Sequence, residues 1–168
     1  MDKLLTIINN QMLAALGTLE QSIRDCPEDQ WKESHGDAPF CQVIFHTLFY
    51  VDFYLTDNEE EFKAQDFHRQ NQEMFRDYEE LEYKKAENLY TKKEIENYFN
   101  FCLKKSEETF KALNEADAYQ QCREKEMHRL ELFINTIRHV QHHAAQLGLR
   151  IQGLTGKELR YLSSGRPS

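Results

Sequence analysis

The chain has few residues that break helices and few that build disulfides. Its 168 residues include 6 glycines, 3 prolines and 4 cysteines, and no two cysteines form a Cys-x-x-Cys pair. Such a composition favours long helices and excludes a disulfide scaffold. No apolar run is long enough for a membrane span, and the first residues lack the basic start and the cleavage site of a signal peptide. We therefore expect one soluble, cytoplasmic domain with reduced thiols and no membrane partner.

Positive charge is also scarce. Lys and Arg number 21 against 29 Asp and Glu, which gives a formal net charge of -8. The basic residues do not cluster along the sequence, so this charge balance opposes binding to a phosphate backbone. We expect no nucleic-acid partner.

Apolar residues recur at helical spacing in four long segments, residues 5–23, 40–55, 91–113 and 126–153. Three segments show steps of three and four residues, whereas the second, "FCQVIFHTLFYVDFYL", is apolar almost all round and is expected at the centre of the fold. A Thr91-x-x-Glu94 capping box marks the start of the third segment. Gly153 and Gly156 mark the end of the fourth.

A long acidic connection, roughly residues 57–90, separates the second and third segments. In a compact domain a connection of this length usually crosses the helices or covers something. The sequence therefore predicts an all-α fold, a four-helix bundle with a long crossover between its second and third helices. Residues 1–153 would form the bundle domain, and residues 154–168 a polar C-terminal tail. The part of the tail from Lys157 to Ser168 could be a frayed extension of the last helix.

The segment "RHVQHHAAQ", residues 138–146, holds three histidines in five positions. At about 100° per residue, His139 and His143 lie about 40° apart on one helical face, one turn from each other. Their Cβ atoms should then be about 5–6 Å apart, close enough for both rings to meet one ion. The pair flanks the apolar stripe and is expected to face inward, whereas His142 is expected to point to the opposite side.

His46 lies in the middle of the second, apolar segment, where a buried imidazole needs a hydrogen-bond partner or a metal ion. Alone, an i,i+4 histidine pair is more often a surface feature, and a lone buried histidine is more often a core residue. Together, three neutral imidazoles and one open position are typical of a catalytic site for zinc or a similar divalent ion. The remaining histidines, His35, His68 and His128, are not expected to be ligands.

These residues resemble the DinB/YfiT-like metalloenzymes over roughly residues 1–153. The resemblance rests on a long first helix, on His46 in "FHTLFYVDFYL", and on the His-x-x-x-His-x-x-Gln pattern of His139, His143 and Gln146. It implies a four-helix bundle, often a homodimer, with a divalent metal bound by the three histidines. Characterised relatives include S-transferases and isomerases that use a low-molecular-weight thiol. The family's last motif often reads His-x-Gly-Gln or His-Arg-Gly-Gln, whereas this chain has His143-Ala144-Ala145-Gln146. Alanine in place of glycine affects packing and not the ligands.

The first functional hypothesis is a metal-dependent enzyme. His46, His139 and His143 would hold zinc or nickel, and a water or a thiol in the open position would give hydrolysis or S-transfer on a small molecule. Tyr50 and Gln146 could line the cavity or serve only in packing. The alternative is a non-catalytic metal- or small-molecule-binding bundle, a sensor or interaction module. A third interpretation leaves the histidines hydrogen-bonded and metal-free. An accessible coordination position beside a cavity would favour the enzyme.

Overall fold

The computed structural model describes residues 3–34, 38–56, 60, 62, 66–68, 88–122 and 126–165. Four long helices account for most of them: α1 (Lys3–Asp25), α2 (Phe40–Tyr54), α5 (Lys92–Ala112) and α7 (Arg129–Thr155). A 3-10 turn (Glu28–Gln30) and a short helix, α6 (Glu115–Ala118), are also present. The described residues contain no strand, only one isolated bridge between Gln121 and His128. The predicted all-α class is confirmed. Most of the connection expected at 57–90 lies outside the described residues.

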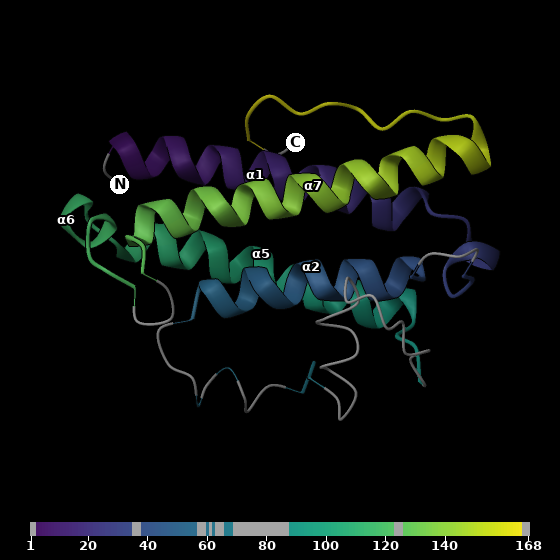
Figure 1. The fold of residues 1–168 in the computed structure, drawn as a ribbon, viewed down its shortest axis with the longest axis horizontal. Coiled ribbons are helices and arrows are strands. Elements are labelled where there is room, and N and C mark those ends of the chain that lie inside the picture. The colour runs from purple at the N-terminus through teal and green to yellow at the C-terminus, as the bar shows by residue number, and fades with distance from the viewer. Residues whose placement is uncertain are drawn as a thin grey trace.

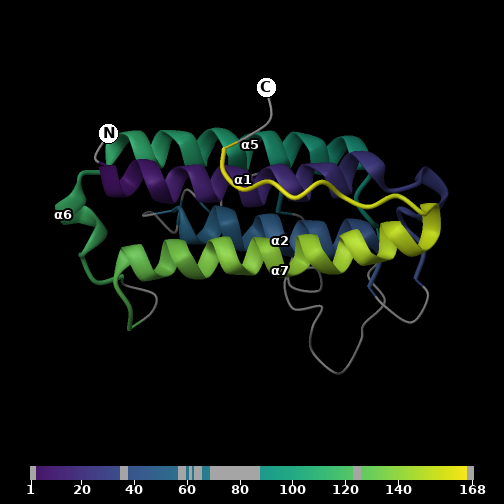
Figure 2. The ribbon, with the colours of Figure 1, turned by 90° about the horizontal axis from the view of Figure 1, so that it is seen from above.

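The four long helices lie side by side with their axes roughly aligned (Figures 1 and 2). Helix α1 packs against α7 and α5, and α2 packs against the same two helices. Their apolar faces meet in one shared core, as the helical spacing predicts. The largest fully buried side chains in this core include Trp31, Tyr98, Phe40, Phe45, Phe110 and Phe133.

Helices α2 and α5 run in the same direction. The pairs of residues that touch between them advance together along both helices, in the order Phe45 with Tyr98, Leu48 with Cys102, and Asp52 with Lys105. The end of α2 and the start of α5 therefore lie at opposite ends of this helix pair.

Helices α2 and α7 run in opposite directions. The guanidinium of Arg150, near the end of α7, donates a 2.9 Å hydrogen bond to the carbonyl oxygen of Ala38 and lies 4.0 Å above the ring of Phe40. The end of α7 is thus fixed beside the start of α2. The middle of one helix consequently faces the middle of the other, which is where the predicted histidines lie.

The helix boundaries follow the expected signals at most ends. The hydroxyl of Thr91 accepts from the backbone N–H of Glu94, and the Glu94 carboxylate accepts from the backbone N–H of Thr91, so the predicted capping box is present. Helix α7 begins at Arg129, three residues later than expected, and ends before Gly156, whose φ of 73° suits glycine. Helix α6 was not predicted, because four residues are too few to show a period.

From Gly156 onward the tail does not extend α7. Its described residues turn back along α1 (Figure 1), where the Gln21 side chain exchanges two 3.0 Å hydrogen bonds with the backbone of Arg160. Further along, the Gly165 N–H donates to the Asn10 carbonyl oxygen at 2.9 Å. The expected frayed extension is wrong for these residues, because Gly156 reverses the chain and α1 offers partners to the backbone of the tail.

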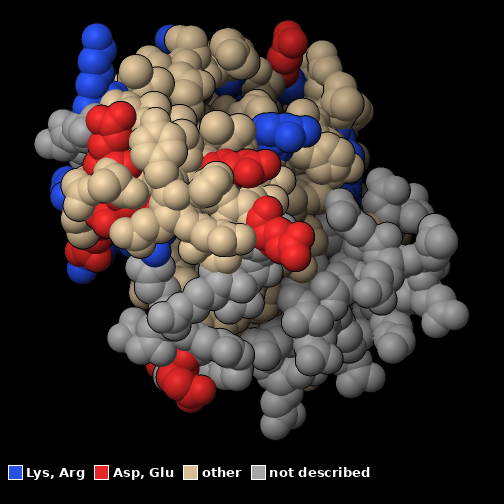
Figure 3. Space-filling view, turned by 60° about the vertical axis from the view of Figure 1, so that its left-hand side comes forward, with Lys and Arg blue, Asp and Glu red and all other residues tan. Residues whose placement is uncertain are grey.

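The surface carries charges of both signs. On the end of the molecule shown in Figure 3, acidic and basic side chains are both spread among uncharged ones. Within the part of the chain that the structure describes, no helix has the length and apolarity to cross a membrane.

Candidate metal centre

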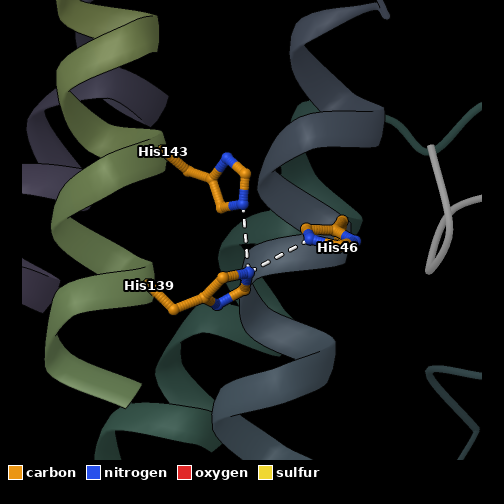
Figure 4. Close-up of side chains that lie close together, drawn as sticks. All are labelled: His46, His139 and His143. Atoms are coloured by element: carbon orange, nitrogen blue, oxygen red, sulfur yellow. Dashed lines mark hydrogen bonds between the residues drawn. The ribbon is translucent and has the colours of Figure 1, made fainter. Parts of the chain in front are cut away.

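Helices α2 and α7 bring three histidine rings together (Figure 4). The Nε2 atom of His139 lies 3.1 Å from Nε2 of His46 and 3.0 Å from Nε2 of His143. One ring nitrogen from each residue lies within 4.8 Å of the other two, so the group could hold a metal ion. The three histidines that the sequence singles out therefore do converge, and we refer to them as the histidine cluster.

Two of the three spacings within the histidine cluster are close to what a metal ion requires. Zinc–nitrogen bonds of about 2.0–2.1 Å at tetrahedral angles place two ligand nitrogens about 3.3 Å apart. The two Nε2–Nε2 distances of 3.1 and 3.0 Å are slightly shorter than this value. Small rotations of the rings would admit an ion. Three imidazole donors suit zinc, nickel, copper or iron, and do not suit magnesium or calcium.

Because two of the three clustered histidines are buried, their rings need a hydrogen bond or a metal ion. His46 is 4% exposed and His143 is fully buried, whereas His139 is half-buried. A buried imidazole without a hydrogen bond or a metal loses its hydration with no compensation. The Tyr50 ring meets the rings of His46 and His139 edge-on, at centroid distances of 5.0 and 5.3 Å. Tyr50 thus packs against two of the three rings.

Gln146 orients one ring of the histidine cluster. Its side-chain oxygen lies 2.8 Å from Nδ1 of His143. Because an amide oxygen only accepts, Nδ1 carries the hydrogen and Nε2 keeps its lone pair toward the other two rings. The sequence left open whether Gln146 lines the cavity or serves only in packing, and the structure instead shows a hydrogen bond to His143. The three-residue step from His143 to Gln146, close to one helical turn, is the signal that could have shown the contact.

We expect Gln146→Ala to weaken metal binding by about 10-fold, because outer partners of metal-bound histidines typically contribute 10- to 100-fold in affinity. Competition with a coloured chelator measures the dissociation constant. Gln146→Glu keeps an acceptor and should retain most of the affinity. Gln152→Ala, at an exposed position of the same helix, is the matched control. Equal dissociation constants for Gln146→Ala and the unmodified chain would contradict the orienting role.

His142 does not point to the opposite side of the helix, so that expectation is wrong. Its ring lies 4.9 Å from the ring of His143, although the residue is exposed. The reason is helical geometry, because three residues advance about 300°, which returns His142 to within about 60° of His139. His142 nevertheless lies outside the histidine cluster.

The remaining histidines also lie outside the histidine cluster where they are described. The exposed His128 contacts the Tyr119 carbonyl oxygen through Nδ1 at 2.7 Å. His68 lies against Asp52 on another side of α2. His35 falls outside the described residues.

A pocket of about 470 Å³ opens beside the histidine cluster. We call it the histidine pocket. It is lined by His46, Tyr50, Tyr54, Asn135, Arg138, His139 and His142. A small molecule can therefore reach two of the three clustered histidines from solvent.

Comparisons with known proteins do not assign the chain to a family. No family model, no curated protein and no solved structure matches the chain. The resemblance to the DinB/YfiT-like proteins therefore stays a prediction. What the histidine cluster can do follows from its donor atoms, its burial and its pocket.

A second polar cluster, which the sequence did not predict, joins α2 to α5. The fully buried carboxylate of Asp52 accepts hydrogen bonds from Tyr98 at 2.9 Å and from Lys105 at 2.5 Å. His68 lies 3.5 Å from the same carboxylate and 3.0 Å from the Tyr98 hydroxyl. Burial alone would raise the pKa of Asp52, but the hydrogen bond with His68, the charge of Lys105 and the other hydrogen bonds outweigh it and lower this pKa. Only the polarity of Asp52 in an apolar segment hinted at this cluster.

The buried cysteines are poor nucleophiles. Burial raises the pKa values of Cys26 and Cys41 to about 12, and raises that of Cys102 well above its usual value. These three thiols therefore stay protonated at neutral pH, and the thiolate is the reactive form.

Proposed function

We propose that the chain is a metal-dependent enzyme in which His46, His139 and His143 hold a divalent ion, with zinc or nickel as the main candidates. The observation that carries this proposal is the convergence of three Nε2 atoms beside an open pocket. Three protein ligands with one accessible position distinguish catalytic sites from closed structural ones.

In this proposal the histidine cluster holds the metal ion and the histidine pocket holds the substrate. When bound, such an ion lowers the pKa of a coordinated water or thiol and so supplies a nucleophile at neutral pH. Gln146 keeps the Nε2 lone pair of His143 directed into the histidine cluster, and Tyr50 covers two of the rings. The histidine pocket admits the small-molecule substrate. The three buried cysteines are protonated at neutral pH and do not supply the thiol for S-transfer. The family resemblance instead implies a separate low-molecular-weight thiol.

On this proposal the chain is a DinB/YfiT-like protein. Helices α1, α2, α5 and α7 would form its four-helix bundle, with a long crossover between α2 and α5 and with the domain ending near residue 153. The parallel direction of α2 and α5 supports the crossover, because parallel neighbours cannot be joined by a short loop.

The same resemblance predicts a homodimer. Exposed apolar side chains on α7, Ile134 and Leu149, are compatible with a contact between copies. Sedimentation at micromolar concentration should give twice the 20.1 kDa mass of the chain. A single species of monomer mass would contradict the dimer and leave the metal centre untouched.

One observation favours a non-catalytic metal-binding module as the alternative. Among the described residues that line the histidine pocket, none is Asp or Glu. A carboxylate general base, common in catalytic zinc sites, is therefore not part of that lining. A sensor or interaction module needs no such base.

The test compares reactions with and without metal. Protein purified without a histidine tag is stripped with chelator and reloaded with zinc, nickel or cobalt. It is then assayed for substitution of a thiol for the halogen of a halogenated aromatic, with release of halide, and for ester hydrolysis. An enzyme shows a metal-dependent rate that His139→Ala abolishes. Bound metal with no rate above that of the stripped protein would favour the sensor. No bound metal would refute both proposals.

A further inference from the structure

The histidine pocket has an unusual charge for this chain. The chain carries a net charge of -8, yet the described lining of the pocket holds one arginine, no lysine and no carboxylate. The other lining side chains outside the histidine cluster are neutral hydrogen-bonding groups or the titratable His142. Among the described residues, the lining of the pocket is therefore locally more positive than the protein as a whole.

Helices α2 and α7, which carry the histidine cluster, together also have more basic than acidic residues. Helix α7 carries three arginines, at 129, 138 and 150, and a single acidic residue, Glu131. Helix α2 carries one acidic residue, Asp52, which is fully buried and paired with Lys105. Glu131 is thus the single acidic side chain that these two helices expose.

Arg138 is the charged group of the pocket. It is exposed at the pocket wall and directly precedes the cluster residue His139. Within the described part of the chain, its side chain has no hydrogen bond or ion pair. Asn135 and His142 lie three residues before it and four after it, so these side chains are its neighbours on the same helical face. A guanidinium in this position is available to a ligand and is well suited to a planar oxyanion.

We propose that the substrate of this centre carries an anionic group, a carboxylate or a similar oxyanion, which Arg138 binds while another part of the molecule reaches the histidine cluster. This inference rests on the proposed function, and it adds the charge of the substrate. Asn135 lies beside Arg138 and offers an amide that can donate to the same oxyanion.

The test uses two small thiols that differ in charge. Mercaptopropionate carries a carboxylate and mercaptopropanol carries a hydroxyl at the same end. Each is titrated into cobalt-loaded protein, and the thiolate-to-cobalt charge-transfer band gives the dissociation constant. The preference for the anionic thiol should be about tenfold greater in the unmodified chain than in Arg138→Gln, a difference of about 1.4 kcal/mol. The ratio within each protein removes any intrinsic difference between the two thiols.

Two controls isolate the effect of Arg138. Lys104→Gln removes one positive charge from an exposed position on α5 and should leave the preference unchanged, which excludes an effect of net charge. Arg138→Lys keeps the charge and should retain part of the preference. Raising the salt concentration should weaken the preference, because the site is exposed.

The outcomes separate this inference from the function on which it rests. If both the unmodified chain and Arg138→Gln bind cobalt and show the same preference for the anionic thiol, the proposal of an anionic substrate is wrong. The metal centre is not contradicted by that result. If Lys104→Gln also loses the preference for the anionic thiol, the effect cannot be assigned to Arg138. Failure to bind cobalt at all refutes the metal centre itself, and the inference falls with it.

Discussion

Replacing His143 with alanine is expected to reduce bound metal from about one ion per chain to almost none. His143 is fully buried, and its Nε2 lies 3.0 Å from that of His139. Its loss leaves two ligands where a tetrahedral site needs three from the protein. His46→Ala should have the same effect. Equilibrium dialysis against micromolar zinc, followed by elemental analysis of the protein, measures the metal content.

The matched control for this experiment is His142→Ala. It removes a neighbouring histidine that lies outside the histidine cluster, so metal content should barely change. Metal lost from His142→Ala but kept by His143→Ala would show that the ligands are wrongly assigned. Because metal binding needs neutral imidazoles, metal affinity in the unmodified chain should also fall as the pH drops through the range where imidazoles take up protons.

The second large effect is expected at Asp52. Asp52→Ala should lower the free energy of unfolding by about 3–5 kcal/mol, because it leaves the partly buried ammonium of Lys105 without its counter-charge. Urea unfolding at neutral pH, followed by circular dichroism, measures this loss. Glu108→Ala is the matched control, since it breaks an exposed ion pair with Lys104 on the same helix as Lys105 and should cost about 0–1 kcal/mol. Equal losses for the two variants would contradict a buried ion pair.

The lowered pKa of Asp52 also predicts how the stability of the fold changes at acidic pH. Its pKa is lowered in the folded chain, so the unfolded chain takes up the proton first as the pH falls. The stabilisation is complete above the ordinary carboxyl pKa of about 3.9 and is lost as the pH falls through the lower folded value. Asp52→Asn should therefore show a shallower loss of stability below about pH 4 than the unmodified chain does. Equal slopes of stability against pH in the two proteins would show that the Asp52 carboxylate does not contribute to the loss of stability in acid.

The sequence predicted the parts of this molecule that depend on local pattern. Apolar periodicity located the four long helices, and the Thr91–Glu94 capping box located one of their starts. His46 was informative because an imidazole in an apolar helix is costly, and the pair at 139 and 143 was informative because four residues make about one turn. Together they located the histidine cluster without any knowledge of how the helices pack.

The features that the sequence did not predict depend on contacts between distant segments. The buried pairing of Asp52 needs Lys105 from another helix, and the path of the tail needs Gln21 on α1. Neither contact leaves a periodic signal. The position of His142 was an error of a different kind, because helical geometry alone places it beside the pair and not opposite it.

The distance along the chain between the clustered histidines has a consequence for folding. His46 and His139 are 93 residues apart, so an ion held by both would close a loop of more than half the chain. The site does not exist until α2 and α7 have met, and binding free energy is then folding free energy. Such an ion would act as a removable cross-link, and a higher concentration of metal would raise the fraction of the protein that is folded.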